Sequence, residues 1–337
     1  MADTVSPVCA DDSDQWLFDR LACPTDGSSL VREENWLISE AGRRYPIVDD
    51  LPVLLRDDIR QTAWWASQSL EIAKAVAEGK VPSPRHDWDQ GAVHPYVQNI
   101  VASTCGHLYR ASRGKLTEYP IPDLRLSANR GETMLDIGCN WGRWCFAAAR
   151  RGLKPIGIDP SLGAVLAARD IARQLDLECA FVVGDARHLP FRQDSFDHCF
   201  SYSVLQHFSK PDAKSAFEEI HRCLKLGGMT LVQMPNRFGI RSAFHLAKRG
   251  FSEGQEFDVR YYTPAELEGI FTEIFGNSIV TVDGYFGLGI QPSDMRFMSL
   301  LGRMVTRSSE LLRQVSLRMP VLKNVADSLY LESTKEP

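Results

Sequence analysis

Short, mainly apolar runs recur through the middle of the chain, and several end at or just before glycine or aspartate. The first is Met134–Ile137, and the segments Lys154–Asp159, Cys179–Gly184 and Phe196–Tyr202 follow at intervals that leave room for a helix between them. Continuous apolar runs of this length are typical of strands buried on both faces of a parallel sheet. Their alternation with helical segments predicts an α/β fold with helices on both faces of the sheet.

The pattern is different at the two ends of the chain. Alternating polar and apolar positions in Ser29–Val31 and Asn35–Ser39, separated by turn residues, predict short antiparallel strands. Residues 57–79 and 95–112 are expected to be helical, and Thr263 is expected to cap a further helix in a capping box with Glu266.

Size and charge restrict the classes of function. The chain has 337 residues, a net charge of −5 and 44% hydrophobic residues, which is enough for a sizeable core. A mildly acidic chain is a poor electrostatic partner for nucleic acid, so no stable nucleic-acid complex is expected.

Cysteine usage and the N-terminal sequence indicate the compartment. The eight cysteines form no C-x-x-C pair, which favours free thiols in a reducing environment. The acidic N-terminus lacks the apolar core of a signal peptide, and no apolar run is long enough to span a bilayer. We therefore expect a cytoplasmic protein.

The segment that follows the first strand carries the chemistry. Gly138 and Gly142 have no side chains, so a small ligand can approach the backbone at this turn. Asp159 ends the second strand, where a carboxylate can accept hydrogen bonds from both hydroxyls of a ribose. A dinucleotide fingerprint would need glycine at Asn140 and Arg143, so a nicotinamide or flavin role is disfavoured.

Five motifs in order, LDIGCNWGRW, GIDPS, GDARHLPF, FDHCFSYSVLQHF and LKLGGMTLV, resemble those of class I S-adenosylmethionine (SAM)-dependent methyltransferases. The resemblance covers residues 127–291. It implies a Rossmann-like seven-stranded sheet with an antiparallel last strand, for which Ser328–Thr334 is the candidate, SAM as cofactor and S-adenosylhomocysteine as product. Asn140 replaces the usual glycine, but asparagine tolerates left-handed backbone conformations. The cofactor-binding residues that the resemblance implies are Asp136, Gly138, Cys139, Asn140, Gly142, Asp159, Pro160, Asp185, Ala186 and Ser203.

The resemblance also suggests residues on the substrate side. His207 is a candidate base, because neutral imidazole can accept a proton from a hydroxyl, although a packing or capping histidine explains it equally well. His107 and Tyr109 either contact cofactor or substrate or pack in the core. Gln206, Asn236 and Arg237 are further candidate substrate contacts.

The N-terminal segment carries a second resemblance. LACP followed by WLIS and YPIVDDLPVLL resembles a family of zinc-ribbon-derived proteins, some of which activate tRNA and protein methyltransferases. Zinc needs four ligands, and Cys23 has no second thiol nearby, so no metal is expected. This subdomain is either a packing unit or an activating one.

The chain is therefore expected to have four parts: a small N-terminal β subdomain (1–60), helices that link it and cover the cofactor (61–126), a SAM-binding core (127–291), and a helical lid with the final strand (292–337).

Residues 296–323 contain six basic residues and one glutamate, with apolar residues at helical spacing. This predicts either a helix packed through its apolar stripe, or a basic surface that attracts an anionic acceptor or a membrane.

We therefore expect methyl transfer to oxygen or nitrogen of a small molecule, a saccharide or a lipid-linked biosynthetic intermediate. Two alternatives remain: a tRNA-modifying enzyme with its activator fused in the same chain, and a non-catalytic SAM-binding protein. The sequence carries no indication of the oligomeric state.

Overall fold

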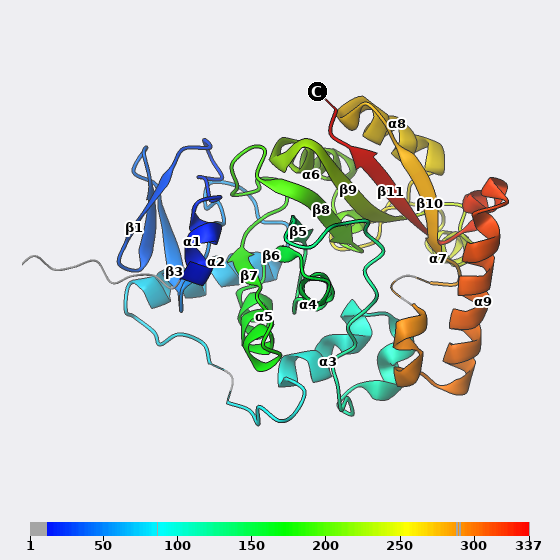
Figure 1. The fold of residues 1–337 in the computed structure, drawn as a ribbon, viewed down its shortest axis with the longest axis horizontal. Helices are drawn as coiled ribbons and strands as arrows, with labels where there is room; N and C mark the ends of the chain where they lie inside the picture. Colours follow the sequence, from blue (N-terminus) through cyan, green and yellow to red (C-terminus); the bar gives the residue numbers. More distant parts are fainter. Residues whose placement is uncertain (1–11, 86, 288, 290, 337) are drawn as a thin grey trace, which may run out of the picture.

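The computed structural model describes residues 12–85, 87–287, 289 and 291–336, and its centre is a seven-stranded sheet (Figure 1). The strand order is β10-β11-β9-β8-β5-β6-β7. The five strands from β9 to β7 run parallel, and β11 is antiparallel to both of its neighbours. The strands are β5 (Thr133–Ile137), β6 (Lys154–Asp159), β7 (Ala180–Val183), β8 (Phe196–Tyr202), β9 (Leu224–Pro235), β10 (Ile279–Gly284) and β11 (Ser328–Thr334). The predicted α/β sheet with an antiparallel last strand is confirmed.

Helices cover both faces of this sheet, as Figure 1 shows. On one face, α4 (Arg143–Arg150) and α5 (Leu162–Gln174) pack on β5, β6 and β7. On the other face, α6 (Lys210–Cys223) and α8 (Pro264–Phe275) pack on β8 to β11. Each face has its own apolar core, because the strands between them carry side chains to both sides.

The N-terminal subdomain is a four-stranded antiparallel sheet preceded by a short helix. Its elements are α1 (Asp12–Phe18), β1 (Leu30–Glu33), β2 (Trp36–Ser39), β3 (Arg44–Val48) and β4 (Leu51–Pro52). The segment after β4 lies along the edge strand β7, where Val53 forms a parallel bridge with Val183 and the Leu54 N–H donates to the Val183 carbonyl at 2.7 Å. Val53 enters one core of the central sheet and Leu54 the other, so the subdomain extends the sheet and shares its cores.

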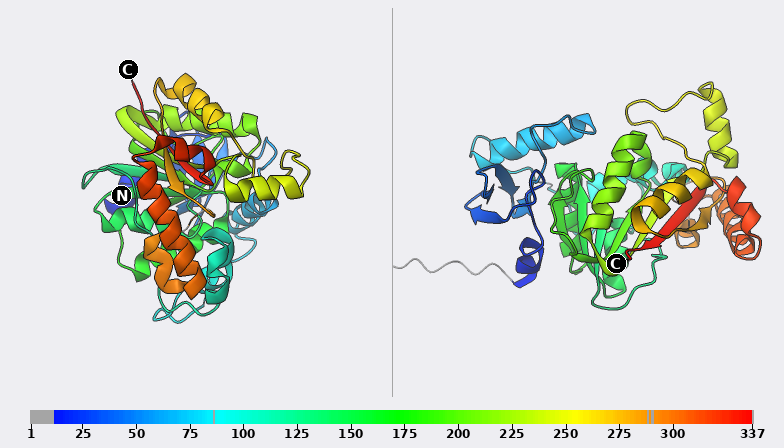
Figure 2. Two further views of the ribbon diagram at one scale, coloured as in Figure 1. Left: turned by 90° about the vertical axis from the view of Figure 1, so that its right-hand side faces the viewer. Right: turned by 90° about the horizontal axis from the view of Figure 1, so that it is seen from above.

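The remaining elements lie at the carboxyl ends of the strands and along the sides of the sheet. They are α2 (Trp64–Ala77), α3 (Pro95–Thr104), η1 (His107–Ser112), η2 (Leu205–His207), α7 (Ile240–Lys248), η3 (Pro292–Phe297), α9 (Leu300–Ser316) and η4 (Pro320–Val325). The N-terminal subdomain and α9 lie at opposite ends of the molecule (Figures 1 and 2). None of the helices in the described part of the chain is both long and apolar enough to cross a membrane.

Several helix boundaries differ from the sequence-based expectation. The helix expected over residues 57–79 begins only at Trp64, and Asp57 instead forms an ion pair with Lys74. The helix expected over 95–112 is interrupted at Gly106, whose φ of 108° no helix accommodates. By contrast, the capping box of Thr263 and Glu266 is present as predicted.

Candidate functional site

The turn between β5 and α4 has the left-handed conformations that its sequence predicts. Gly138, Asn140 and Gly142 have φ values of 76°, 47° and 84°. The Asn140 side-chain oxygen accepts a hydrogen bond from the Trp141 N–H, which stabilises a conformation that few residues other than glycine adopt. The turn therefore forms despite the missing glycine.

Asp159 lies at the end of β6, beside this turn. Its two carboxylate oxygens accept hydrogen bonds from the backbone N–H groups of Asn140 and Ser161, at 3.0 and 2.9 Å. Burial raises the pKa of Asp159 to about 6. An ionised carboxylate has about four lone-pair positions, so two remain for a ligand.

Asp136 and Cys139 are buried at the turn. The Asp136 carboxyl is 1% exposed and accepts a hydrogen bond from the Cys145 thiol at 3.3 Å, and burial raises its pKa to about 7. The Cys139 side chain points towards Gly157, where a Cβ would lie 2.8 Å from its sulfur. We infer that both residues position the turn, and that Cys139 reaches a cofactor only through its backbone.

Asp185, which follows β7, is already occupied by a neighbouring cation. Arg187 donates from its backbone N–H, Nε and Nη2 to the Asp185 carboxylate, at distances from 2.7 to 3.2 Å. The sequence analysis did not anticipate this pairing. The expected hydrogen bond from the adenine amino group to Asp185 stays a prediction, and it must compete with Arg187. Ala186 is buried, and Pro160 is half-buried beside Asp159.

Ser203 begins the segment that follows β8. Its φ is 61°, and its hydroxyl accepts a hydrogen bond from Gln206 Nε2 at 2.8 Å. A non-glycine residue in this conformation is held there by its surroundings, and such strain is often found at functional sites. The Oε1 atom of Gln206 is buried and has no hydrogen-bond partner among the described residues, so it remains available to a ligand.

His207 has a defined orientation, because both of its ring nitrogens have hydrogen-bond partners. Its Nδ1 lies 2.7 Å from the Phe257 carbonyl oxygen, which assigns the proton to Nδ1, and its ring stacks on Phe257 at 4.0 Å. Nε2 is then an acceptor, with Gln206 Nε2 at 3.4 Å. Burial lowers the pKa of His207, so the imidazole is neutral at pH 7.

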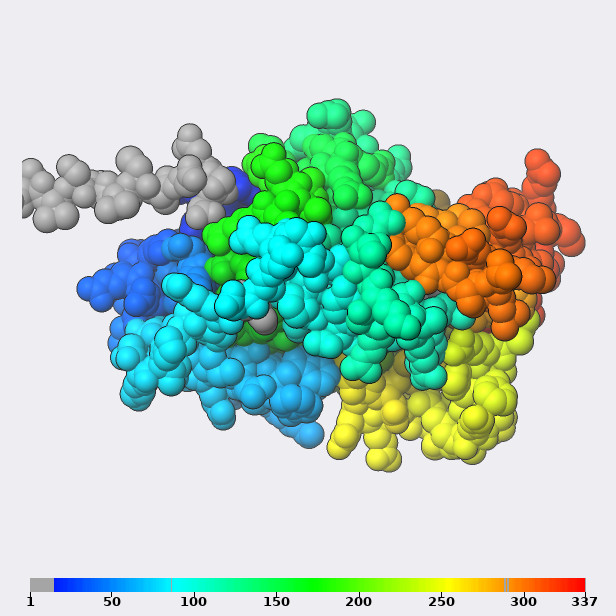
Figure 3. Space-filling view, turned by 90° about the horizontal axis from the view of Figure 1, so that it is seen from below, coloured from blue at the N-terminus to red at the C-terminus, as the bar shows by residue number. Residues whose placement is uncertain are grey.

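A cavity of about 460 Å³ opens beside these residues at the carboxyl end of β8. Segments from three distant parts of the chain adjoin around this region in Figure 3: α3 with η1, the chain around α7, and η3 with α9. The residues that bring charge or hydrogen bonds to its walls include His107, Ser203, Gln206, His207, Arg241 and Arg249.

The walls of the cavity carry charges of both signs, from Arg241 and Arg249 and from Asp258 and Asp327. Arg241, His245 and Arg249 lie four residues apart along and just beyond α7, so that helix presents one basic face to the cavity. Burial and the neighbouring Arg241 lower the pKa of His245. The carboxylate of Asp327 does not face the cavity freely, because it accepts hydrogen bonds from the N–H groups of Arg241, Ser242 and Phe286.

Three of the predicted substrate residues do not line this cavity. Tyr109 is fully buried, and its hydroxyl donates to the carboxylate of Asp294. Asn236 is also fully buried and donates to three backbone carbonyls between residues 323 and 326. Arg237 is exposed outside the cavity.

The sequence analysis missed residues that only the fold brings to the site. Arg241, His245 and Arg249 were visible as basic residues at helical spacing, but nothing in the sequence places that helix over the strand ends. Tyr96 of α3 lies close to Asp159, whose charge, after burial, raises the pKa of the tyrosine. The sequence did offer one indication: Tyr96 follows His94 and Pro95, a pair that is typical of a helix start, so it could be placed in the first turn of a helix.

Comparison with known proteins identifies the central domain. Residues 134–228 match a family described as methyltransferase domain. The tRNA (carboxymethyluridine(34)-5-O)-methyltransferase alkbh8 of Xenopus tropicalis is 34% identical over 139 residues, which are 41% of this chain and 20% of the relative. The phosphoethanolamine N-methyltransferase 2 of Caenorhabditis elegans is 34% identical over 106 residues, which are 31% of this chain and 24% of the relative.

A solved structure resembles the chain more weakly. The Haemonchus contortus phosphoethanolamine N-methyltransferase 2 in complex with S-adenosyl-L-methionine has a TM-score of 0.43 and 19% identity over 63% of this chain and 50% of that chain. The chain spans between a fifth and about half of the length of the curated relatives that it matches, 20% to 53%. It thus contains a SAM-dependent methyltransferase domain. The similarity is confined to that domain and does not extend over the full length of the relatives.

The residues at the strand ends fit SAM as the cofactor of this domain. The buried carboxylate of Asp159 retains acceptor capacity where a ribose needs it, and the turn from Gly138 to Gly142 keeps the backbone accessible beside it. No group of three or more histidine, cysteine or acidic residues gathers as a metal site in the described part of the chain. The Cys23 thiol lies 3.3 Å from the hydroxyl of Tyr45.

Proposed function

We propose that the protein transfers a methyl group from SAM to an oxygen or nitrogen of an anionic small molecule, of which a phosphate-bearing or lipid-linked biosynthetic intermediate is one class. The observation that carries the proposal is the cavity at the end of β8, where Ser203 and His207 lie on a wall shared with Arg241 and Arg249. Ligands of parallel α/β sheets bind beyond the carboxyl ends of the strands, where this cavity lies.

On the cofactor side, Asp159 binds the ribose hydroxyls and the turn from Gly138 to Gly142 binds the amino-acid part through its backbone. Bound SAM supplies an electrophilic methyl group, and S-adenosylhomocysteine is the product. Tyr96 covers the ribose side of this site, and Ser203 lies between cofactor and acceptor. Asp185 and Ala186 address the adenine, with Arg187 holding the Asp185 carboxylate.

On the acceptor side, His207 takes the proton of the attacking hydroxyl or amine through Nε2. The tautomer set by the Phe257 carbonyl and the lowered pKa both support this role. Arg241 and Arg249 bind the anionic part of the acceptor, and the buried Nε of Arg249 lacks a partner among the described residues. Arginine suits phosphate and carboxylate because its planar group donates two parallel hydrogen bonds.

The experiment is a methylation assay with SAM and a panel of phosphorylated amines and alcohols, starting with phosphoethanolamine, with products identified by mass spectrometry. Arg241→Ala and Arg249→Ala should each raise the acceptor KM by about tenfold, because each removes a charge-assisted contact. Arg237→Ala is the matched control, since Arg237 lies on the same connection but outside the cavity. Absence of product with every acceptor, together with intact SAM binding, would favour a non-catalytic SAM-binding protein.

A second candidate is modification of tRNA, because relatives in Xenopus tropicalis and Macaca fascicularis are tRNA methyltransferases. The N-terminal sheet would then act as an activator fused in the same chain, and it covers the β7 edge in a way that supports this idea. The net charge of −5 counts against a large polyanionic acceptor. Methyl incorporation into bulk tRNA, but into none of the small acceptors, would support this candidate.

A further inference from the structure

The helix α9 is oriented with its apolar side outwards. Its buried positions are the small or polar residues Gly302, Thr306, Ser309 and Ser316. Its exposed positions include Leu300, Leu301, Met304, Leu311 and Val315, with exposed fractions between 36% and 79%. The apolar stripe, for which the sequence analysis considered a packing role, is therefore largely exposed. Three of its residues are covered: Met298 is buried, and Val305 and Leu312 are half-buried.

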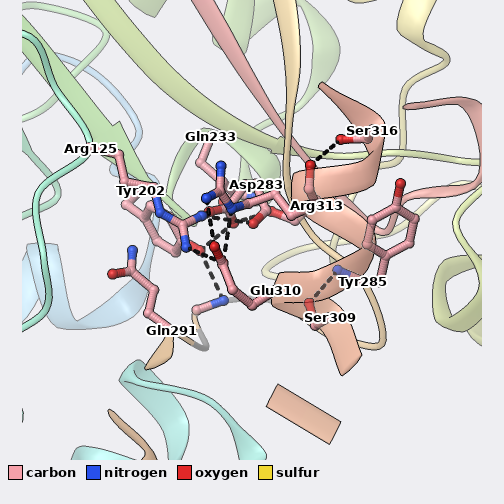
Figure 4. Close-up of polar contacts among 12 residues, drawn as sticks. Arg125, Tyr202, Gln233, Asp283, Tyr285, Gln291, Ser309, Glu310, Arg313 and Ser316 are labelled. Atoms are coloured by element: carbon pink, nitrogen blue, oxygen red, sulfur yellow. Dashed lines mark hydrogen bonds and ion pairs between the residues drawn. The ribbon is translucent and has the colours of Figure 1, made fainter. Parts of the chain in front are cut away.

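Polar contacts explain how this orientation is stable. Ser309 Oγ accepts a hydrogen bond from the Tyr285 N–H at 2.9 Å, and Glu310 pairs with Arg125 and Arg313 at 3.0 and 2.6 Å. Arg125 in turn contacts the buried Asp283, so a polar network joins α9 to β10 (Figure 4). Leu312 packs on the apolar core, but Leu300, Leu301, Met304 and Leu311 stay exposed in the part of the chain that the structure describes.

The exposed apolar surface continues beyond α9. The following η4 exposes Val321 and Val325, and the start of α7 exposes Phe238, Ile240 and Phe244. These two parts are adjacent, because Asn236 donates to carbonyls of η4 and the Arg241 N–H donates to Asp327, which follows η4. We name the surface formed by α9, η4 and the exposed side of α7 the apolar face. Figure 2 shows α7 and α9 on the same side of the molecule.

Positive charge accompanies this face. Arg303 and Arg307 lie four residues apart on α9, and Arg318 follows the end of that helix. Arg307 and Arg318 form no ion pair with any residue in the described ranges. The segment from Arg237 to Phe251 contains four lysine or arginine residues, one histidine and no acidic residue. Cations therefore accompany the apolar face in a chain whose net charge is −5.

From this arrangement we propose that the apolar face binds the surface of an anionic lipid bilayer. An apolar stripe with arginines along its edge is the pattern of a helix that lies in the membrane interface, its apolar side among the acyl chains and its cations at the headgroups. Charge complementarity favours a bilayer over a second copy of this chain, because two such faces brought together would repel each other. The cavity opens beside the same helix α7, so an acceptor carried by the bilayer would meet it there.

The test is sedimentation of the full chain with vesicles of phosphatidylcholine alone or with 30% phosphatidylglycerol, a composition chosen to be about as anionic as many inner leaflets. The parent should bind the anionic vesicles, and binding should weaken as salt rises. Met304→Glu with Leu311→Glu should reduce the association constant by about tenfold or more, and Arg307→Glu with Arg318→Glu by at least about fivefold for each arginine.

A matched control separates this effect from general damage. Leu226→Glu changes an apolar residue that is 64% exposed, like Met304. Leu226 lies near the start of β9, whereas the apolar face adjoins the end of that strand. The Leu226→Glu variant should leave vesicle binding unchanged, and all variants should keep the parent Tm because the altered side chains are exposed.

Equal vesicle binding by the parent and both double variants would overturn the proposal, as would no binding at all by the parent. The proposal would also be overturned if the parent were a dimer and Met304→Glu with Leu311→Glu made it a monomer. In that case the apolar face would bind a second copy of this chain. Vesicle binding needs no methyl transfer, so this result is independent of the proposed function.

Discussion

The side chain of Val204 occupies the space where a Cβ on Gly138 would lie, only 2.3 Å from the valine Cγ2. Gly138 ends β5 on the cofactor side, and Val204 follows β8 on the acceptor side, so this contact joins the two halves of the candidate site. The glycine is therefore needed for this close packing as well as for its φ of 76°. The sequence analysis attributed it to ligand approach alone.

The first prediction concerns this contact. Gly138→Ala should destabilise the protein by about 2–4 kcal/mol, because the left-handed backbone and the clash with Val204 both add to the cost. Thermal unfolding measures the effect. The double variant Gly138→Ala with Val204→Ala should recover part of the loss, but not the part due to the backbone. No recovery in the double variant would show that the packing contact is unimportant.

The second prediction concerns the cofactor. Asp159→Ala should weaken SAM binding by about 1.5–3 kcal/mol for each hydrogen bond that the carboxylate makes to the ribose. The pKa of about 6 sets the pH dependence: the ionised carboxylate binds better, so affinity is full above about pH 7 and falls as the pH drops through 6. Calorimetry at pH 5.5 and 7.5 measures both effects. Asp159→Asn should show little change over this range, and a parent affinity equal at both pH values would contradict the assignment.

The third prediction concerns His207 as the base. His207→Gln should lower kcat by about a hundredfold or more, while SAM affinity stays unchanged. Because burial lowers the pKa of His207 below 6.5, the parent kcat should be constant from pH 7 upwards and fall only in more acidic solution, where the imidazole becomes protonated. His221→Gln on α6 is the control. A His207→Gln kcat within threefold of the parent would leave His207 with a packing role only.

The fourth prediction concerns the N-terminal subdomain. Leu54 is buried against the sheet and donates its N–H to Val183 of the edge strand β7. Leu54→Ala should lower the free energy of unfolding by about 2–5 kcal/mol and shift a single cooperative transition that includes the catalytic core. Val31→Ala on β1, which is 61% exposed, should change stability by less than about 0.5 kcal/mol. Two separate transitions, with only the smaller one shifted, would show that the subdomain is a detachable unit.

The sequence by itself determined the parts of this protein that depend on local chemistry. Buried strands that end in Gly138 and Asp159, the left-handed Asn140 and the capping box of Thr263 follow from residue types at short spacing, and each is present. The seven-stranded sheet and its antiparallel β11 followed from the resemblance of the five motifs to those of class I methyltransferases. Such features could be predicted because a few neighbouring residues decide them.

Only the tertiary structure decided which distant side chains meet. Tyr109 is buried against Asp294, and α7 carries Arg241 to the cavity, and no local pattern specifies these contacts. The direction in which α9 faces is the clearest case, because its amphipathic pattern is compatible with packing either side against the sheet. The polar side of α9 packs against the sheet because Glu310 pairs there with Arg125, which also contacts Asp283. Buried charged groups need such partners, and this orientation provides them.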